Sequence, residues 1–238
     1  MVRYAEITEK NPREIVMLRG AGCRWRRCTF CDYHLDCSSD TAANFALNAK
    51  ILSHITGRFH RLEVINSGSF PELDEQTIQR IIDICWQKKI DTLHFECHWM
   101  YRDSLPALRQ RFRQQGITVK VKSGIETFDA AYREQVLCKG IDETDPAKIA
   151  QPFDECCLLF GLRGQDKTSM EQDIQTGLQY FERVCVNIMT PNTTQIQPDA
   201  AVIREFMQTL YPVYRDNPRV DILIENTDFG IGAENNEE

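Results

Sequence analysis

The sequence predicts an α/β protein whose parallel strands form an incomplete barrel. Short apolar runs alternate with amphipathic stretches along most of its 238 residues. Such alternation implies a parallel sheet with right-handed crossover helices. The apolar runs are too few for a closed eight-stranded barrel, so we expect an incomplete one, with an open doubly wound sheet as the alternative.

The predicted strands are short runs rich in Val, Ile, Leu or Phe, which suits strands covered on both faces. In chain order they are Ile15–Gly20, Leu62–Ser67, Thr92–Trp99, Thr118–Gly124, Cys156–Leu162, Arg183–Met189 and Val220–Asn226. In a barrel and in a doubly wound sheet alike, the chemistry sits at the carboxyl ends of the strands. The informative residues are therefore expected directly after these runs.

Helical patterns fill the segments between the runs. The clearest is Glu72–Lys89, in which Ile78 and Ile82 belong to a set of apolar residues that recur at helical spacing. Gly116 and Gly140 stand where helix C-caps are expected. The other predicted helices are Asn44–Thr56, Leu105–Gln115, Ala130–Lys139, Met170–Phe181 and Ala200–Tyr214.

The composition is that of an ordinary soluble globule, with 42% hydrophobic and 26% charged residues. Asp and Glu number 35 against 28 Lys and Arg, which leaves a net charge of -7. A large polyphosphate partner normally needs a basic face, so a nucleic-acid partner is not expected. No run suits a membrane span or a signal peptide, and the ten cysteines are then expected as reduced thiols in a cytoplasmic protein.

Four cysteines gather directly after the first predicted strand, in the segment GAGCRWRRCTFCDYHLDC. A loop so rich in thiols oxidises readily unless the thiols bind metal or pair with one another. Cys23, Cys28 and Cys31 can each ligate one iron of a cubane cluster, which leaves the fourth iron open to a small chelating molecule. The rival interpretation is structural zinc on these cysteines with Cys37 or His34, although such sites usually pair two ligand knuckles and this loop has one.

Small or polar residues also follow the later strands. Ser67, Gly68 and Ser69 end the second run, where the lack of bulk lets a ligand approach the backbone, although Ser69 also suits a helix N-cap. Glu96 stands inside the third apolar run, so its carboxylate needs a partner. His98 shares its face and suits either a ligand-binding or a structural histidine.

The segment from Cys23 to Cys31, with Phe30 before the last cysteine, resembles the signature loop of the radical S-adenosyl-L-methionine (SAM) superfamily. That family usually shows Cys-x3-Cys-x2-Cys, and here the first spacing is one residue longer. The segments NSGSF, GIET and LLFGLRGQ, after the second, fourth and fifth strands, resemble turns of the same superfamily. The resemblance implies a partial (β/α)6-type TIM barrel within one domain, 1–238, with a core over about 15–190 and a substrate-specific part over about 191–230.

The resemblance also implies the cofactors, a [4Fe–4S] cluster on Cys23, Cys28 and Cys31 and a bound SAM. The residues expected to bind SAM are Phe30, Ser67, Gly68, Ser69, Glu96, Glu126 and Arg163. Thr127, beside Glu126, suits a helix N-cap.

Polar residues cluster after the extra C-terminal strand, in ILIENTDFG, and are expected to form a substrate wall or merely to shape a turn. The substrate candidates are Glu225, Asp228, Asn226, Asn187, His98 and Tyr33. The resemblance is strongest to radical SAM enzymes that handle 7-deazaguanines, and among these the queuine lyases of queuosine salvage fit a compact, acidic chain.

The implied activity is reductive cleavage of SAM to a 5′-deoxyadenosyl radical, followed by scission of the C–N bond of queuine to give 7-aminomethyl-7-deazaguanine. An external electron donor such as flavodoxin or ferredoxin is implied as a partner. Two alternatives stay open: a radical SAM enzyme that modifies tRNA or a peptide, and a non-catalytic zinc or iron–sulfur protein.

Overall fold

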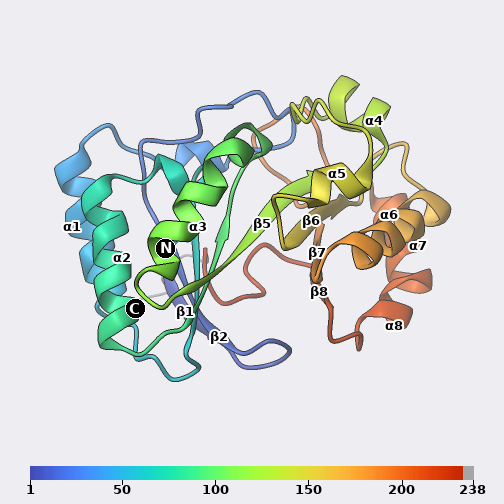
Figure 1. Ribbon diagram of the computed structural model, residues 1–238. Coiled ribbons are helices and arrows are strands. Elements are labelled where there is room, and N and C mark those ends of the chain that lie inside the picture. Colours follow the sequence, from blue (N-terminus) through green and yellow to red (C-terminus); the bar gives the residue numbers. More distant parts are fainter. Residues whose placement is uncertain (233–238) are drawn as a thin grey trace, which may run out of the picture. The chain divides into compact units, whose positions relative to one another are not determined.

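The computed structural model describes residues 1–232 and has one mixed sheet whose strand order follows the chain, from β1 to β8 (Figure 1). The strands are β1 Tyr4–Ile7, β2 Arg13–Leu18, β3 Arg61–Asn66, β4 Thr92–Glu96, β5 Thr118–Glu126, β6 Glu155–Phe160, β7 Arg183–Ile188 and β8 Val220–Leu223. A doubly wound sheet reverses its strand order partway, whereas a barrel keeps it sequential. The observed order is therefore that of the incomplete barrel.

The helices come between the parallel strands. They are α1 Thr41–Leu52, α2 Glu75–Gln87, α3 Leu105–Arg113, α4 Ala130–Gln135, α5 Pro146–Ala150, α6 Lys167–Tyr180, α7 Ala200–Thr209 and α8 Tyr211–Tyr214, with short 3-10 helices η1 Tyr33–Leu35, η2 Phe70–Glu72 and η3 Trp99–Ser104. Within residues 1–232, no helix has the length and apolar character needed to cross a membrane.

The described chain falls into two compact units. The first comprises Met1–Arg26, Tyr33–Val121 and the segment 229–232, and the second comprises Arg27–Asp32 and Lys122–Asp228. Single-domain organisation stays a prediction.

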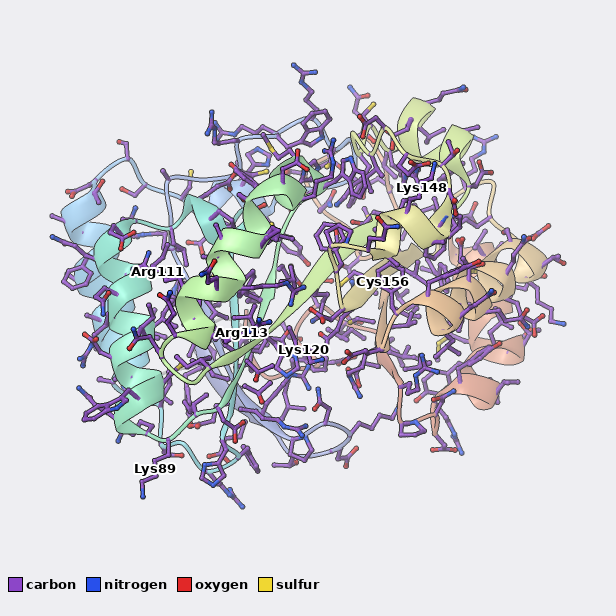
Figure 2. All side chains as sticks on the ribbon, in the orientation of Figure 1. Lys89, Arg111, Arg113, Lys120, Lys148 and Cys156 are labelled. Atoms are coloured by element: carbon purple, nitrogen blue, oxygen red, sulfur yellow. The ribbon has the colours of Figure 1, made fainter. Side chains whose placement is uncertain are left out.

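In the first unit β1 pairs antiparallel with β2, and β2, β3 and β4 run parallel. Helices α1 and α2 pack side by side (Figure 1), and Arg111 of α3, labelled in Figure 2, pairs with Glu75 of α2. The core includes Phe70, whose ring stacks on that of Phe95 with 4.1 Å between their centroids. This stacking fixes η2, and with it the turn that follows β3.

In the second unit β5, β6, β7 and β8 run parallel. All six residues of β6 are buried, as expected of a parallel strand covered on both faces. Helices α6 and α7 pack together, and Phe206 of α7 lies against Phe160 at the end of β6. This ring contact supports the carboxyl end of β6.

All seven predicted strands form, and the bounds of several predicted helices need correction. The predicted helices Asn44–Thr56 and Met170–Phe181 are α1 and α6, which each begin three residues earlier, after the N-cap residues Asp40 and Asp166. The first helix after β3 starts at Glu75, because Asp74 is its N-cap, and Glu72 belongs to η2. Helix α4 ends at Gln135, because the carboxylate of Glu134 accepts hydrogen bonds from the backbone N–H groups of Gly140 and Ile141 and turns the chain. The predicted helix Ala200–Tyr214 is two helices, α7 and α8.

Candidate active site

The carboxylate of Glu72 organises the first half of the cysteine loop. Its Oε1 atom accepts hydrogen bonds from the backbone N–H of Arg24, at 2.9 Å, and from the hydroxyl of Tyr101, at 2.8 Å. Its Oε2 atom accepts the backbone N–H of Ser69 at 2.8 Å. One side chain therefore joins the residue after Cys23 to the turn after β3.

The turn after β3 has no room for a side chain at Gly68. A Cβ atom there would overlap Oε2 of Glu72 and lie 3.1 Å from Cα of Cys23. Ser69 is the N-cap residue of η2, and its hydroxyl accepts the backbone N–H of His98 at 2.9 Å. Both groups of Ser69 are thus engaged within the protein, so its role includes support of the turn.

Two buried polar atoms of this turn lack a protein partner. The Oδ1 atom of Asn66 and the hydroxyl of Ser67 are buried, and neither has a hydrogen-bond partner in the part of the chain that the structure describes. Leaving such a group unsatisfied is costly, typically about 1–3 kcal/mol. Oxygen atoms in this state fit the ammonium group of an amino acid such as the methionyl part of SAM.

The second half of the cysteine loop is held from two sides. Thr29 donates hydrogen bonds to the backbone oxygens of Val136, at 2.6 Å, and Leu137, at 3.2 Å. The side-chain amide of Asn192 donates to the backbone oxygen of Phe30 at 2.6 Å. These contacts fix the backbone between Cys28 and Cys31.

Glu126 ends β5 in an unusual conformation. Its φ is 68°, in the left-handed region that non-glycine residues seldom adopt, and its carboxylate is paired with Lys139 at 2.7 Å. A Cβ atom on Gly124 would lie 2.5 Å from the Glu126 carboxylate and 2.7 Å from the Lys139 ammonium. Glycine at 124 therefore leaves room for this buried ion pair.

Burial lowers the pKa of Lys139, but the negative charges of Glu126, Cys28 and Cys31 and the hydrogen bond to Glu126 together raise it by more. The pKa of Lys139 is consequently raised above its ordinary value, and the side chain is a cation at neutral pH.

The cysteines of the loop differ from those of the core. Burial raises the pKa of the Cys85 and Cys97 thiols to about 12, and that of Cys156, labelled in Figure 2, well above its ordinary value. Thiols of this kind are inert. Cys23, Cys28 and Cys31 are only half-buried and are not in disulfides, so their sulfur atoms can serve as cluster ligands.

Cys37 occupies a separate place in the first unit. Its residue forms a β-bridge with Gly20, and its sulfur would lie 3.3 Å from a Cβ atom on Gly22. These contacts are consistent with a packing role for Cys37.

The remaining residues expected to bind SAM lie at different depths. Glu96 is the half-buried last residue of β4. The side chain of Arg163 is exposed. Thr127 is not the N-cap of α4, since Asp129 accepts the backbone N–H groups that open this helix.

Two of the substrate candidates lie in the first unit. The ring of His98 stacks on Trp25 with 5.1 Å between centroids, and its Nδ1 atom accepts the backbone N–H of Met100 at 3.2 Å. His98 thus has a structural role as the N-cap residue of η3. Tyr33 is 61% exposed.

The four candidates of the second unit are not equivalent. The Asp228 carboxylate accepts the backbone N–H groups of Ile224, at 2.7 Å, and Glu225, at 3.0 Å, so it shapes the turn after β8. The amide of Asn226 donates to the hydroxyl of Thr190 at 2.8 Å. Glu225 is exposed, and Asn187 is half-buried near the end of β7.

Within residues 1–232, no group of three or more His, Cys, Asp or Glu side chains is placed to hold a metal ion.

Sequence reasoning missed four residues of these sites. Glu72 stands three residues after Ser69, a capping-box spacing that could have pointed to it. Asn66 lies within the NSGSF segment but was not singled out, and the buried hydroxyl of Ser123 has no partner among the described residues. Lys139 carries no sequence signal, because it falls in the predicted helix Ala130–Lys139.

Two solved structures are similar to this chain. The chain is similar to queuine lyase from Clostridium spiroforme bound to SAM and queuine, with 41% identity, a TM-score of 0.93 and coverage of 98% of this chain and 100% of that one. It is also similar in fold to Streptococcus suis SuiB bound to precursor peptide SuiA, with 12% identity, a TM-score of 0.55 and coverage of 87% of this chain and 48% of that one. No protein-family model and no curated protein sequence matches the chain.

The sequential barrel order and the three-cysteine loop after β2 define an enzyme of the radical SAM class, with a [4Fe–4S] cluster and SAM as cofactors. Identity over nearly the whole of both chains goes further than the class. The chain belongs to the queuine lyase family.

Proposed function

We propose that this enzyme cleaves the C–N bond of queuine and releases 7-aminomethyl-7-deazaguanine. The observation that carries the proposal is the 41% identity to a queuine lyase over 98% of this chain. A free base also suits the net charge of -7, which is unfavourable for a tRNA substrate.

The cysteine loop and the ends of β3 and β5 would hold the cofactors. Cys23, Cys28 and Cys31 would ligate the cluster, and the buried oxygens of Asn66 and Ser67 would accept the methionyl ammonium of SAM. When bound, the cluster and SAM supply a 5′-deoxyadenosyl radical that abstracts a hydrogen atom from the substrate. Glu126 would accept ribose hydroxyls of SAM, as carboxylates do in other adenosine sites.

The turn after β8 would recognise the base. A 7-deazaguanine presents a ring N–H and an exocyclic amine side by side, and a carboxylate accepts both with its two oxygens. Glu225 suits this role better than Asp228, whose carboxylate already accepts two backbone N–H groups. Asn187 can add a donor and an acceptor.

One-electron reduction of the cluster requires an external donor of the flavodoxin or ferredoxin kind. A reducing cytoplasm is consistent with ten cysteines that are all free thiols in the described chain.

The direct test is anaerobic reconstitution of the full chain with iron and sulfide, followed by incubation with SAM, dithionite and queuine. We expect mass spectrometry to detect 7-aminomethyl-7-deazaguanine together with 5′-deoxyadenosine formed faster than without queuine. The Cys31→Ala variant should form neither product, and Cys37→Ala should form both. If 5′-deoxyadenosine accumulates at one rate with and without queuine and no deazaguanine product appears, the substrate assignment is wrong.

A further inference from the structure

Lys139 is a buried cation of the second unit that lies near a carboxylate and near an aromatic ring of the cysteine loop. Its side chain is 12% exposed, and its ammonium lies 2.7 Å from Oε1 of Glu126. The same nitrogen lies 5.6 Å from the centre of the Phe30 ring. The only residue between Phe30 and Cys28 is Thr29, and Cys31 follows Phe30 directly.

The backbone keeps this arrangement in place. Thr29 is hydrogen-bonded to the backbone oxygens of Val136 and Leu137, so the segment that leads to Lys139 runs beside the segment that carries the two cysteines. Cys138, the residue before Lys139, has a φ of 53°, in the strained left-handed region. Strain of this kind persists only where the surroundings hold it, and it is common at functional sites.

We propose that Lys139 tunes the cluster without being one of its ligands. The positive charge of its ammonium group, beside Cys28 and Cys31, raises the reduction potential of the cluster. Reduction adds one electron to the cluster, and a fixed positive charge nearby stabilises the reduced form. Glu126 limits this effect, because its carboxylate lies against the same ammonium. The inference rests on the proposed cluster site and extends it to a residue that is not a ligand.

The ion pair of Lys139 and Glu126 allows the effect of charge on the cluster to be tested with substitutions of opposite sign. The full-length enzyme is reconstituted anaerobically, without SAM, and its cluster is titrated with dithionite and redox mediators while the reduced signal is followed by electron paramagnetic resonance. We expect Lys139→Met to lower the midpoint potential of the cluster and Glu126→Gln to raise it. The midpoint potential of the double variant should be lower than that of Glu126→Gln. The matched control is Lys148→Met. Lys148 lies on α5 (Figure 2), its side chain is 60% exposed, and it pairs with Glu143 at 3.7 Å.

A purely structural role would not produce shifts of opposite sign. If Lys139→Met lost its iron, the comparison of Glu126→Gln with the double variant would still isolate the charge of Lys139 on a neutral background. Equal potentials in those two proteins, or shifts in one direction for both single variants, would overturn the role of Lys139 and leave the proposed function standing. A wild-type protein that takes up no cluster would instead overturn the proposed function, and this inference with it.

Discussion

The Oε2 atom of Glu72 accepts the backbone N–H of Ser69 at 2.8 Å in the space that a side chain on residue 68 would fill. The same carboxylate holds the backbone of Arg24, next to Cys23. The loop that carries the first cysteine and the turn proposed to receive the methionyl ammonium therefore share one support. A change at this point should affect both cofactors.

Gly68→Ala should displace the Glu72 carboxylate, because the new Cβ atom would overlap it. We expect SAM to bind at least about tenfold more weakly, which corresponds to the loss of about one hydrogen bond to a charged group. Equilibrium binding to the reconstituted enzyme measures this. The control is Gly20→Ala, whose Cβ atom would make only ordinary contacts, at 3.7 Å with Leu73 and at 3.8 Å with the backbone oxygen of Glu72. Equal affinities in the two variants would contradict the prediction.

Single Ala substitutions at Cys23, Cys28 and Cys31 should abolish the cluster, because each thiolate would ligate a different iron. Iron and sulfide analysis after reconstitution measures this, together with the visible absorption of the cluster. Cys37→Ala should retain iron at the wild-type level, since Cys37 packs against Gly22. Loss of the cluster from Cys37→Ala would contradict this prediction and revive the site with four cysteine ligands.

Glu225→Gln and Asp228→Asn should differ in kind. Glu225→Gln removes a charged contact to the base, worth about 1.5–3 kcal/mol, so we expect KM for queuine to rise by about tenfold or more with folding unchanged. Asp228→Asn weakens a carboxylate that accepts two backbone N–H groups, so we expect a lower free energy of unfolding. Steady-state kinetics and urea unfolding separate the two, and the reverse pattern would move substrate recognition to Asp228.

Ionisation of the buried Asp173 carboxyl should lower the free energy of unfolding as the pH rises from about 4 to 6. Burial raises the pKa of this carboxyl from 3.8 to about 6, against the hydrogen bond that its Oδ1 accepts from the N–H of Phe128 at 2.7 Å. Between these values the folded state binds more protons than the unfolded state, so the stability contributed by the protonated form is lost as the pH passes through the folded pKa. The largest effect is about 3 kcal/mol, at 1.36 kcal/mol per pKa unit.

Asp173→Asn should remove this dependence, because an amide does not ionise over that range. Urea unfolding at pH 4, 5, 6 and 8 measures it, and the advantage of the variant over wild type should grow with pH. A difference that stays constant from pH 4 to 8 would show that the Asp173 carboxyl ionises alike in the folded and unfolded states.

The strands were the predictable part of the fold, because β2 to β8 are largely buried and read as apolar runs. The edge strand β1, Tyr4–Ile7, was missed because three of its four residues are half-buried and mix polar with apolar types. The predicted helix Ala130–Lys139 is longer than α4, because the end of α4 depends on which backbone groups the Glu134 carboxylate binds and not on helix propensity.

The sequence by itself determined the class of chemistry, because three cysteines within nine residues are kept near one another by the chain whatever the rest of the fold does. It also placed Ser67, Gly68 and Glu126 at strand ends, because strand position follows from apolar patterning. Only the tertiary structure decided what those residues touch. Glu126 meets Lys139 across a chain reversal, and Glu72 meets Arg24 from 48 residues away. Contacts of this kind depend on how folded elements pack, which local sequence patterns do not encode.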